Sequence, residues 1–324
     1  MAVAEAETTT AVAPAPGTGT PVPARRGRPL WVRVLPYLLV APTVLGTAYL
    51  LAYPLVRNLL ISFQKFGIGQ LIRGGAEFVG FDNYRKILTD QMFWDVVRRT
   101  FVYTAINVGL ILVLATLVAV LIGALGKWMR FAVMSGLVLA WAIPVIAATT
   151  VFQWLFQSQL GVVNWVLVAL GFKQYDGYAW FAHGTSTFAI IVVLIVWQSV
   201  PFAALTLYAA MTTVPKELHE SAQIDGAGGF KTFWLITFPI LRPMFGLILC
   251  LEIIWIFKCF VQIWAISQGG PGNATLTLPV YAYQIAQSLN RYDLGAAISM
   301  VTVLLLTVVL LAYFRQMFKE EGEL

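Results

Sequence analysis

Charged residues are scarce in this sequence. Asp, Glu, Lys and Arg make up 11% of the 324 residues, whereas hydrophobic residues make up 59%. A soluble globular domain carries roughly 25% charged residues, so this composition excludes an ordinary water-soluble domain and indicates a surface that faces lipid. The net charge is +6, but the basic residues are scattered between apolar runs. Nucleic-acid binding needs clustered Lys and Arg, so we expect no nucleic-acid partner.

Cysteine and histidine are almost absent. The two cysteines, Cys250 and Cys259, lie in one apolar run, which excludes a disulfide framework and is typical of small packing residues. The two histidines, His183 and His219, lie in predicted loops. The sequence therefore offers no nucleophile–base pair and no metal cluster, which disfavours a membrane enzyme.

Long apolar runs are what the sequence has instead. A helix needs about 20 apolar residues to cross a hydrocarbon core of about 30 Å. Strands are disfavoured because the runs do not alternate and an open sheet edge is too costly in lipid. The sequence predicts an all-α membrane protein, with kinks at Pro36, Pro42 and Pro144. The six predicted spans are 34–56, 100–125, 131–156, 187–212, 243–267 and 293–314.

The termini and loops have distinct compositions. Residues 1–24 are rich in Ala, Thr and Pro, which predicts a disordered tail. The segment RRGRPLWVR that follows could be a twin-arginine export signal, but we interpret it as a positive segment that keeps both termini in the cytoplasm. The predicted domains are a tail (1–30), a six-helix domain (31–316) and a second tail (317–324). In the first loop, 57–99, apolar residues recur at helical spacing and predict a small structured cap.

The loop 213–242, which we call the elbow, contains the stretch ELHESAQIDGAGG. Residues 216–224 favour a short helix after Pro215. The run from Asp225 to Gly229 ends that helix, because glycine readily accepts positive φ. A second amphipathic segment then leads through Pro239 and Pro243 into the fifth span. The sequence predicts a helix, a sharp turn and a second helix on the cytoplasmic side.

The elbow resembles the EAA loop of ABC-importer permeases, E-A-A-x3-G-x9-I-x-L-P. The matching positions are Glu220, Ser221, Ala222, Gly226, Ile236, Phe238 and Pro239, with Ser221 in place of the first alanine and Phe238 in place of leucine. The stretches FVGFDNYRKIL, AWAIPVIAATTVFQWLF and GGPGNATLTLPVYAYQIA resemble the carbohydrate-uptake branch, which includes the maltose permeases. The resemblance covers residues 34–316.

The resemblance implies a binding-protein-dependent importer in the bacterial plasma membrane. Its partners would be a second homologous permease, two nucleotide-binding ATPase subunits, an extracytoplasmic sugar-binding protein and the lipid bilayer. ATP and Mg would be used by the partners. In this chain the only Gly-Lys pair, Gly126-Lys127, is followed by Trp128 rather than Ser or Thr, so no phosphate-binding loop is present. We expect no enzyme activity and no bound cofactor or metal.

The resemblance also assigns the elbow a role in coupling to an ATPase subunit. Its short helix would dock in a cleft of that subunit, with Glu220 pairing with basic groups there. Ser221 and Ala222 would allow close approach and Gly226 would make the turn. The predicted coupling residues are Glu220, Ser221, Ala222, Asp225, Gly226, Ile236 and Pro239.

Charged and polar residues in the fourth and fifth spans predict the cargo path. A charge inside a span is costly and usually faces water, and Glu252, Trp255, Cys259 and Gln262 share one face if the helix is continuous. Lys258 would then lie about 120° from Glu252. The maltose-type resemblance adds Ile256 and, on the fourth span, a second patch. That patch comprises Trp197, Gln198, Ser199 and Phe202.

We therefore predict the permease subunit of an ATP-driven importer of a sugar, specifically an oligosaccharide. One alternative is a glycerol-3-phosphate permease of the same architecture, which Glu252 on the predicted path disfavours. Another is an ion-coupled secondary transporter with Glu252 and Lys258 as a proton relay. Such folds often contain repeats, and no repeat of the elbow or of any span is visible.

Overall fold

The computed structural model describes residues 30–321, so the predicted disordered tail and most of the positive segment that follows it lie outside the described residues. The chain divides into two compact units, residues 1–54 and 55–324. The first unit holds most of helix α1 (Leu30–Ser62), which continues through Pro36, Pro42 and Pro54. The predicted first span is therefore helical, as expected.

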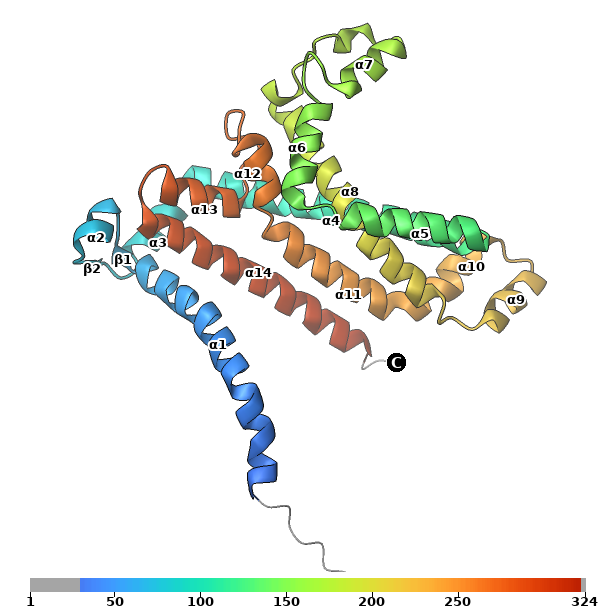
Figure 1. Ribbon diagram of the computed structural model, residues 1–324, viewed down its shortest axis with the longest axis horizontal. Coiled ribbons are helices and arrows are strands. Elements are labelled where there is room, and N and C mark those ends of the chain that lie inside the picture. The colour runs from blue at the N-terminus through green and yellow to red at the C-terminus, as the bar shows by residue number, and fades with distance from the viewer. Residues whose placement is uncertain (1–29, 322–324) are drawn as a thin grey trace, which may run out of the picture. The chain divides into compact units, whose positions relative to one another are not determined.

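In the second unit, five helices lie side by side (Figure 1): α4 (Gln91–Ala124), α5 (Lys127–Trp141), α8 (Gly184–Met211), α11 (Phe238–Phe257) and α14 (Tyr292–Glu321). Small residues let the helices approach closely. Ala115 and Ala119 of α4 and Ala203 and Ala204 of α8 are fully buried, and α4 packs along α8. The core therefore sits between α4, α8 and α11.

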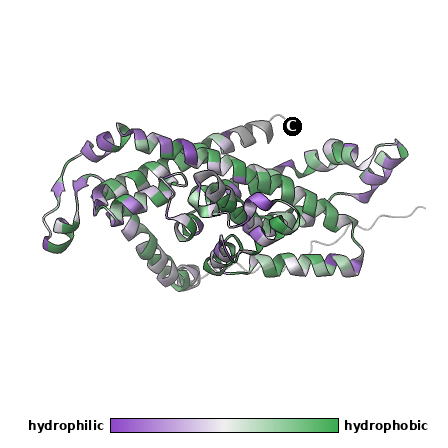
Figure 2. Ribbon diagram, turned by 90° about the horizontal axis from the view of Figure 1, so that it is seen from above, coloured by the Kyte–Doolittle hydropathy of each residue, from purple (hydrophilic) through white to green (hydrophobic). Residues whose placement is uncertain are grey.

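Apolar helices dominate the second unit between two polar ends. Figure 2 shows hydrophobic residues along the bundle and hydrophilic ones near α9 (Lys216–Ile224) and, at the opposite end, near α2 (Ile68–Arg73). Within residues 30–321, five helices are long and apolar enough to cross a membrane, or six if one bent pair counts as a single span. The predicted all-α membrane fold is confirmed.

The third predicted span is not one straight helix. The chain forms α5 and then α6 (Val145–Leu155), and these two helices meet at 96°. Pro144 is the residue that precedes α6, and proline lacks the N–H that a continuing helix would need. The predicted kink at Pro144 is therefore a complete break. Beyond it lie α7 (Val162–Ala169) and the 3₁₀ turns η1 (Lys173–Tyr175) and η2 (Trp180–Ala182).

The fifth predicted span is also interrupted. Helix α11 ends at Phe257, and after a break at 258–260 the chain forms α12 (Val261–Ser267). At its other end α11 starts earlier than predicted, at Phe238. It continues directly from α10 (Gly229–Thr232) and a π-helical turn, η3 (Phe233–Thr237). Pro239 therefore lies in the first turn of a continuing helix and does not separate two segments.

Helix α13 (Leu278–Gln287) follows the buried residues 275–277 and packs on α14. The Leu278 N–H donates to Thr100 Oγ1 at 2.9 Å. The Tyr281 hydroxyl donates to Asp90 Oδ2 at 3.1 Å, while Asp90 Oδ1 caps α4 by accepting from the Met92 N–H. Burial, followed by the charge of Asp90 and this hydrogen bond, raises the pKa of Tyr281 to about 12, so the phenol remains a donor at neutral pH.

The first loop forms the predicted cap. Strands β1 (Gln64–Lys65) and β2 (Glu77–Phe78) pair antiparallel, with Gln64 opposite Phe78. Helix α2 lies between them and α3 (Asp82–Leu88) follows. Asn83 is 1% exposed, and its Nδ2 donates to the Ser62 and Gln64 carbonyls at 3.0 and 2.8 Å.

Asn83→Ala is expected to loosen this cap, because the buried Ser62 carbonyl would lose its donor at a cost of about 1–3 kcal/mol, and the part-buried Gln64 carbonyl would lose its donor as well. Limited proteolysis in nanodiscs should show faster cleavage within residues 63–90. Glu77→Ala, a change at an exposed strand residue, is the control and should leave the cleavage rate unchanged. Equal cleavage of both variants would show that Asn83 does not hold the cap.

Candidate functional site

A cavity of about 370 Å³ lies between α8, α11 and α12. It contains both polar and aromatic side chains, and its lining combines the two spans that the sequence assigned to the cargo path. The lining residues are Trp141, Ile195, Gln198, Ser199, Trp255, Ile256, Lys258, Cys259, Phe260, Val261 and Gln262. Six of the nine predicted path residues therefore line one cavity.

Hydrogen bonds tie the polar lining together across two helices. Cys259 Sγ donates to Gln262 Oε1 at 3.1 Å, and Gln262 Nε2 donates to Gln198 Oε1 at 3.0 Å. Behind α12, Gln153 Nε2 donates to the Ala265 carbonyl at 2.7 Å. This network positions two amides at the cavity wall, where each can also donate to or accept from a ligand.

Aromatic rings form the adjoining wall. The Phe202 ring lies 5.5 Å from the Trp255 ring and 6.0 Å from the Trp141 ring. Phe202 therefore supports the two tryptophans without lining the cavity itself. Trp197 also lies outside the lining, where its ring is 5.9 Å from that of Phe152.

Glu252 does not face the cavity. Its side chain is 0% exposed, and neither carboxyl oxygen has a hydrogen-bond partner of standard geometry among the described residues. Ser199 of α8 is the polar side chain that interacts with it. The carboxyl group is therefore enclosed by helix packing behind the cavity wall.

Lys258 occupies the position in which Glu252 was expected. The prediction that Lys258 points away from the path is wrong, because it lines the same cavity as Trp255 and Gln262. That prediction assumed a continuous helix with a rotation of 100° per residue, whereas α11 ends at Phe257 and Lys258 lies in the break before α12. Lys258 is the one charged side chain in the lining, so Glu252 gives no reason to disfavour an anionic cargo.

The elbow has the predicted outline. Helix α9 spans Lys216–Ile224, and Gly226 follows with φ of +75°. The Gly226 N–H donates to the Gln223 carbonyl at 3.0 Å, and the Ala227 N–H donates to the Ala222 carbonyl at 2.8 Å. These bonds satisfy carbonyls at the helix end, and they require the left-handed backbone that glycine adopts without strain.

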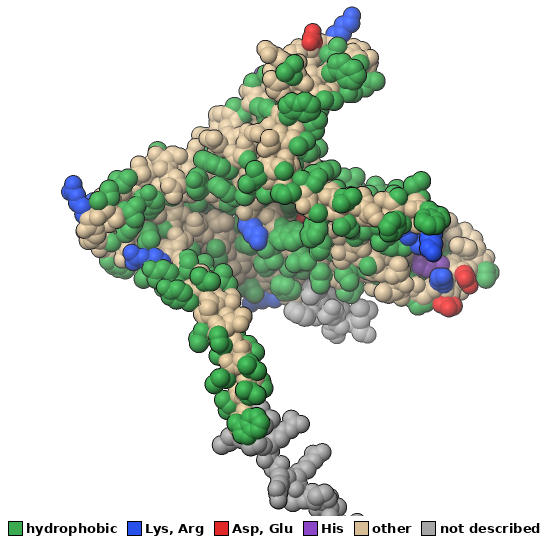
Figure 3. All heavy atoms as spheres, viewed as in Figure 1, with side chains coloured by type: hydrophobic (Ala, Val, Ile, Leu, Met, Phe, Trp, Pro, Cys, Tyr) green, Lys and Arg blue, Asp and Glu red, His purple; other side chains and the backbone are tan. Residues whose placement is uncertain are grey.

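Most predicted coupling residues lie on the outer surface of the elbow. Glu220, Ser221, Asp225, Gly226 and Pro239 are exposed, whereas Ala222 is buried and Ile236 is half-buried. Leu218, four residues before Ala222 on α9, is 40% exposed. Figure 3 shows acidic, basic and histidine side chains gathered at the α9 end of the second unit, beside a mostly apolar bundle.

His219 forms a connection within the elbow that was not predicted from the sequence. His219 Nε2 lies 3.3 Å from Thr237 Oγ1, and Nδ1 lies 3.5 Å from the Pro215 carbonyl. Thr237 ends the π-helical turn that leads into α11, and such turns often occur at functional sites. The position of His219 next to Glu220 in the motif was the one available signal. Among the described residues, no three His, Cys, Asp or Glu side chains gather as a metal site.

Three comparisons relate this chain to known proteins. Residues 98–319 match the family model described as "Binding-protein-dependent transport system inner membrane component". The diacetylchitobiose uptake system permease protein DasB of Streptomyces coelicolor is 48% identical over 89% of this chain and 88% of its own length. The sulfoquinovosyl glycerol transport system permease protein SmoG of Agrobacterium fabrum is 34% identical over 87% of this chain and 90% of its own length.

A solved structure shows the same fold. The crystal structure of a bacterial ABC transporter involved in import of the acidic polysaccharide alginate superposes with a TM-score of 0.77 at 20% identity, covering 89% of this chain and 97% of that chain. The match to the family model extends over more than half of the sequence and includes the elbow and the polar cavity. This chain belongs to the family of inner membrane components of binding-protein-dependent transport systems, the permease subunits of ABC importers.

Proposed function

We propose that this chain is the permease subunit that forms the path for an oligosaccharide in an ATP-driven importer. The observation that carries the proposal is the cavity in which Gln198 and Gln262 lie beside Trp141 and Trp255. A sugar offers hydroxyl groups to amides and a C–H face to aromatic rings. The cavity volume lies within the roughly 300–1,000 Å³ of small-molecule sites.

The cargo class we infer is a short oligosaccharide with N-acetyl groups. Support comes from the 48% identical relative, which is named for diacetylchitobiose uptake. The lining fits such a ligand, because Lys258 and the two glutamines can donate to acetamide carbonyls. Glycerol 3-phosphate is the second candidate, and Lys258 is the residue that favours it.

The proposed assembly contains a second homologous permease, two ATPase subunits that use ATP and Mg, and an extracytoplasmic binding protein. Glu220, Ser221, Ala222, Asp225 and Gly226 would contact an ATPase subunit, with Ile236 and Pro239 supporting the elbow from behind. His219 and Thr237 would pass its movement to α11. Both termini and the elbow would lie in the cytoplasm, and Trp197, Phe202 and Glu252 would support the path from outside the cavity.

A sugar screen tests this proposal. The complex in nanodiscs, with its binding protein, is expected to hydrolyse ATP faster with N-acetylated disaccharides than with unsubstituted ones or glycerol 3-phosphate. Stimulation by glycerol 3-phosphate alone would favour the second candidate. Uptake that stops when the proton gradient is dissipated at constant ATP would contradict the ATP-driven mechanism and support the ion-coupled alternative.

Trp255→Ala is expected to raise the KM for uptake roughly 2- to 10-fold, because an aromatic contact is worth about 0.5–1.5 kcal/mol. Assembly with the ATPase subunits, measured by co-purification, should not change. Trp165→Ala is the matched control, since Trp165 is exposed on α7 and does not line the cavity. An unchanged KM for Trp255→Ala would exclude this residue from the path.

A further inference from the structure

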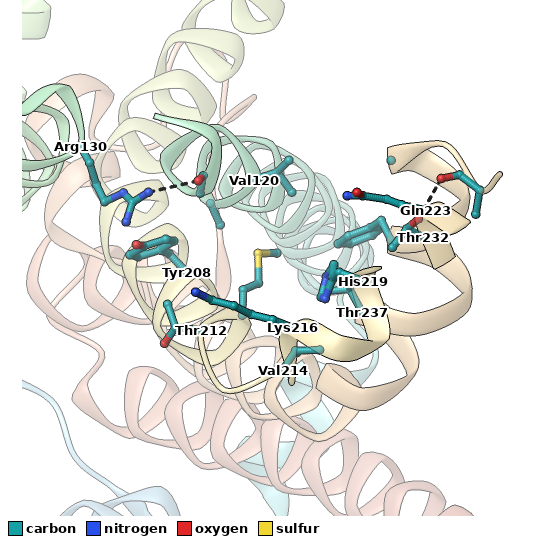
Figure 4. Close-up of a pocket in the computed structure, with 16 residues that line it drawn as sticks. Val120, Arg130, Tyr208, Thr212, Val214, Lys216, His219, Gln223, Thr232 and Thr237 are labelled. Carbon is teal, nitrogen blue, oxygen red and sulfur yellow. Dashed lines mark hydrogen bonds between the residues drawn. The ribbon is translucent and has the colours of Figure 1, made fainter. Parts of the chain in front are cut away.

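A second and larger cavity, of about 650 Å³, lies between the elbow and the bundle. Its walls come from the end of α4, the start of α5, the end of α8, and from α9, α10 and η3 (Figure 4). It is separate from the proposed cargo path, because none of its lining residues lines the first cavity.

The lining carries positive charge without a carboxylate. Arg130 and Lys216 contribute this charge, and no Asp or Glu is among the lining residues. The acidic residues of this end, Glu217, Glu220 and Asp225, are exposed. Lys216 forms no ion pair with any residue in the described range 30–321.

Hydrogen bonds hold the Arg130 side chain at the C-terminal end of α4. Its Nε donates to the Ile122 carbonyl at 3.1 Å, and Nη2 donates to the Gly123 and Leu125 carbonyls at 3.2 and 2.9 Å. Its guanidinium carbon lies 5.7 Å from the centre of the Tyr208 ring. Within residues 30–321 Nη1 makes no hydrogen bond, so it can donate to a ligand. In Figure 4 the Lys216 side chain extends toward Arg130, Tyr208 and Thr212.

We propose that this cavity binds a phosphate group between Arg130 and Lys216, with the Tyr208 hydroxyl group as a further partner. A phosphate carries a charge of about −1 to −2 and several acceptor oxygens, and it matches a fixed guanidinium and an amine. The phosphate could belong to a soluble phosphorylated compound or to a phospholipid headgroup. Because α9 and η3 form two of the walls, its binding would stabilise one position of the elbow.

Competitive amine labelling of the full chain in nanodiscs, without ATPase subunits, tests this site. With phosphatidylcholine alone, inorganic phosphate is expected to reduce acetylation of Lys216 several-fold and saturably, relative to chloride at equal ionic strength. Lys127 and Lys231 are exposed and outside the lining, so their acetylation is the internal reference. Protection by phosphatidylglycerol in the nanodisc, without added phosphate, would identify the lipid headgroup as the source.

Arg130→Gln should abolish the protection of Lys216, and Arg130→Lys should restore part of it. Because Arg130 also caps α4, Tyr208→Phe, which removes only a hydroxyl group, provides a milder variant that should weaken protection. Absence of protection from both phosphate and phosphatidylglycerol would overturn the proposal, and so would equal protection in wild type and Arg130→Gln. Neither result would bear on the cargo path, since the labelling requires no transport.

Discussion

Gly226→Val is expected to uncouple ATP hydrolysis from cargo uptake. The backbone of Gly226 has φ of +75°, a conformation that costs an L-residue about 1–2 kcal/mol and that is a genuine outlier for a β-branched side chain. No atom lies within 4 Å of the added Cβ, so the effect would come from the backbone alone. The turn after α9 would open, and Glu220 and Ser221 would leave their positions on the elbow.

Gly228→Val is the matched control for this turn. Gly228 lies two residues further along with φ of −68° and open space around its Cβ, so valine fits there without strain. Gly226→Asn should fall between the two, because asparagine tolerates positive φ. Uptake and binding-protein-stimulated ATPase activity are measured in proteoliposomes. Normal uptake by Gly226→Val would refute a coupling role for this turn.

Gly295→Val is expected to prevent stable packing of α13 on α14. A Cβ at Gly295 would lie 2.7 Å from Ala286 Cβ and 2.8 Å from the Ala282 carbonyl oxygen. The carbonyl is backbone within a helix and cannot rotate away, so the cost should reach or exceed the 1–3 kcal/mol typical of overpacking. The yield of monodisperse protein in detergent should fall, and the melting temperature should drop.

Gly109→Val tests the same substitution on a free helix face. Gly109 lies in α4, and no atom is within 4 Å of its added Cβ, so valine there should leave yield and melting temperature close to wild type. Equal stability of the Gly295 and Gly109 variants would show that α13 and α14 are not closely packed in the native protein.

Local patterns predicted the helices well where a single rule applied. Apolar length alone located α4, α8 and α14, since a membrane requires about 20 apolar residues whatever their neighbours. The bounds of α9 followed from Pro215 and from the glycines after Asp225. In each case the determining interaction lies within a few residues of the chain.

Helical periodicity did not predict side-chain directions correctly where a helix is interrupted. The prediction that Glu252, Trp255 and Gln262 share one face assumed an unbroken helix. In the structure the helix is interrupted at 258–260, Lys258 lines the cavity, and Glu252 is enclosed by packing. The same limit applies to Pro144, because a proline permits a kink or a break and the packing of neighbouring helices decides between them.

The membrane environment, the number of apolar segments and the outline of the elbow could be predicted from the sequence, since these depend on local composition and on motif spacing. The set of polar side chains that share a cavity became visible in the packing of the helices. Gln198 meets Gln262 across 64 positions of sequence, and Arg130 shares a cavity with Lys216 from a different helix. Such contacts between side chains of different helices depend on how the helices cross and where they break, and no local sequence pattern encodes this.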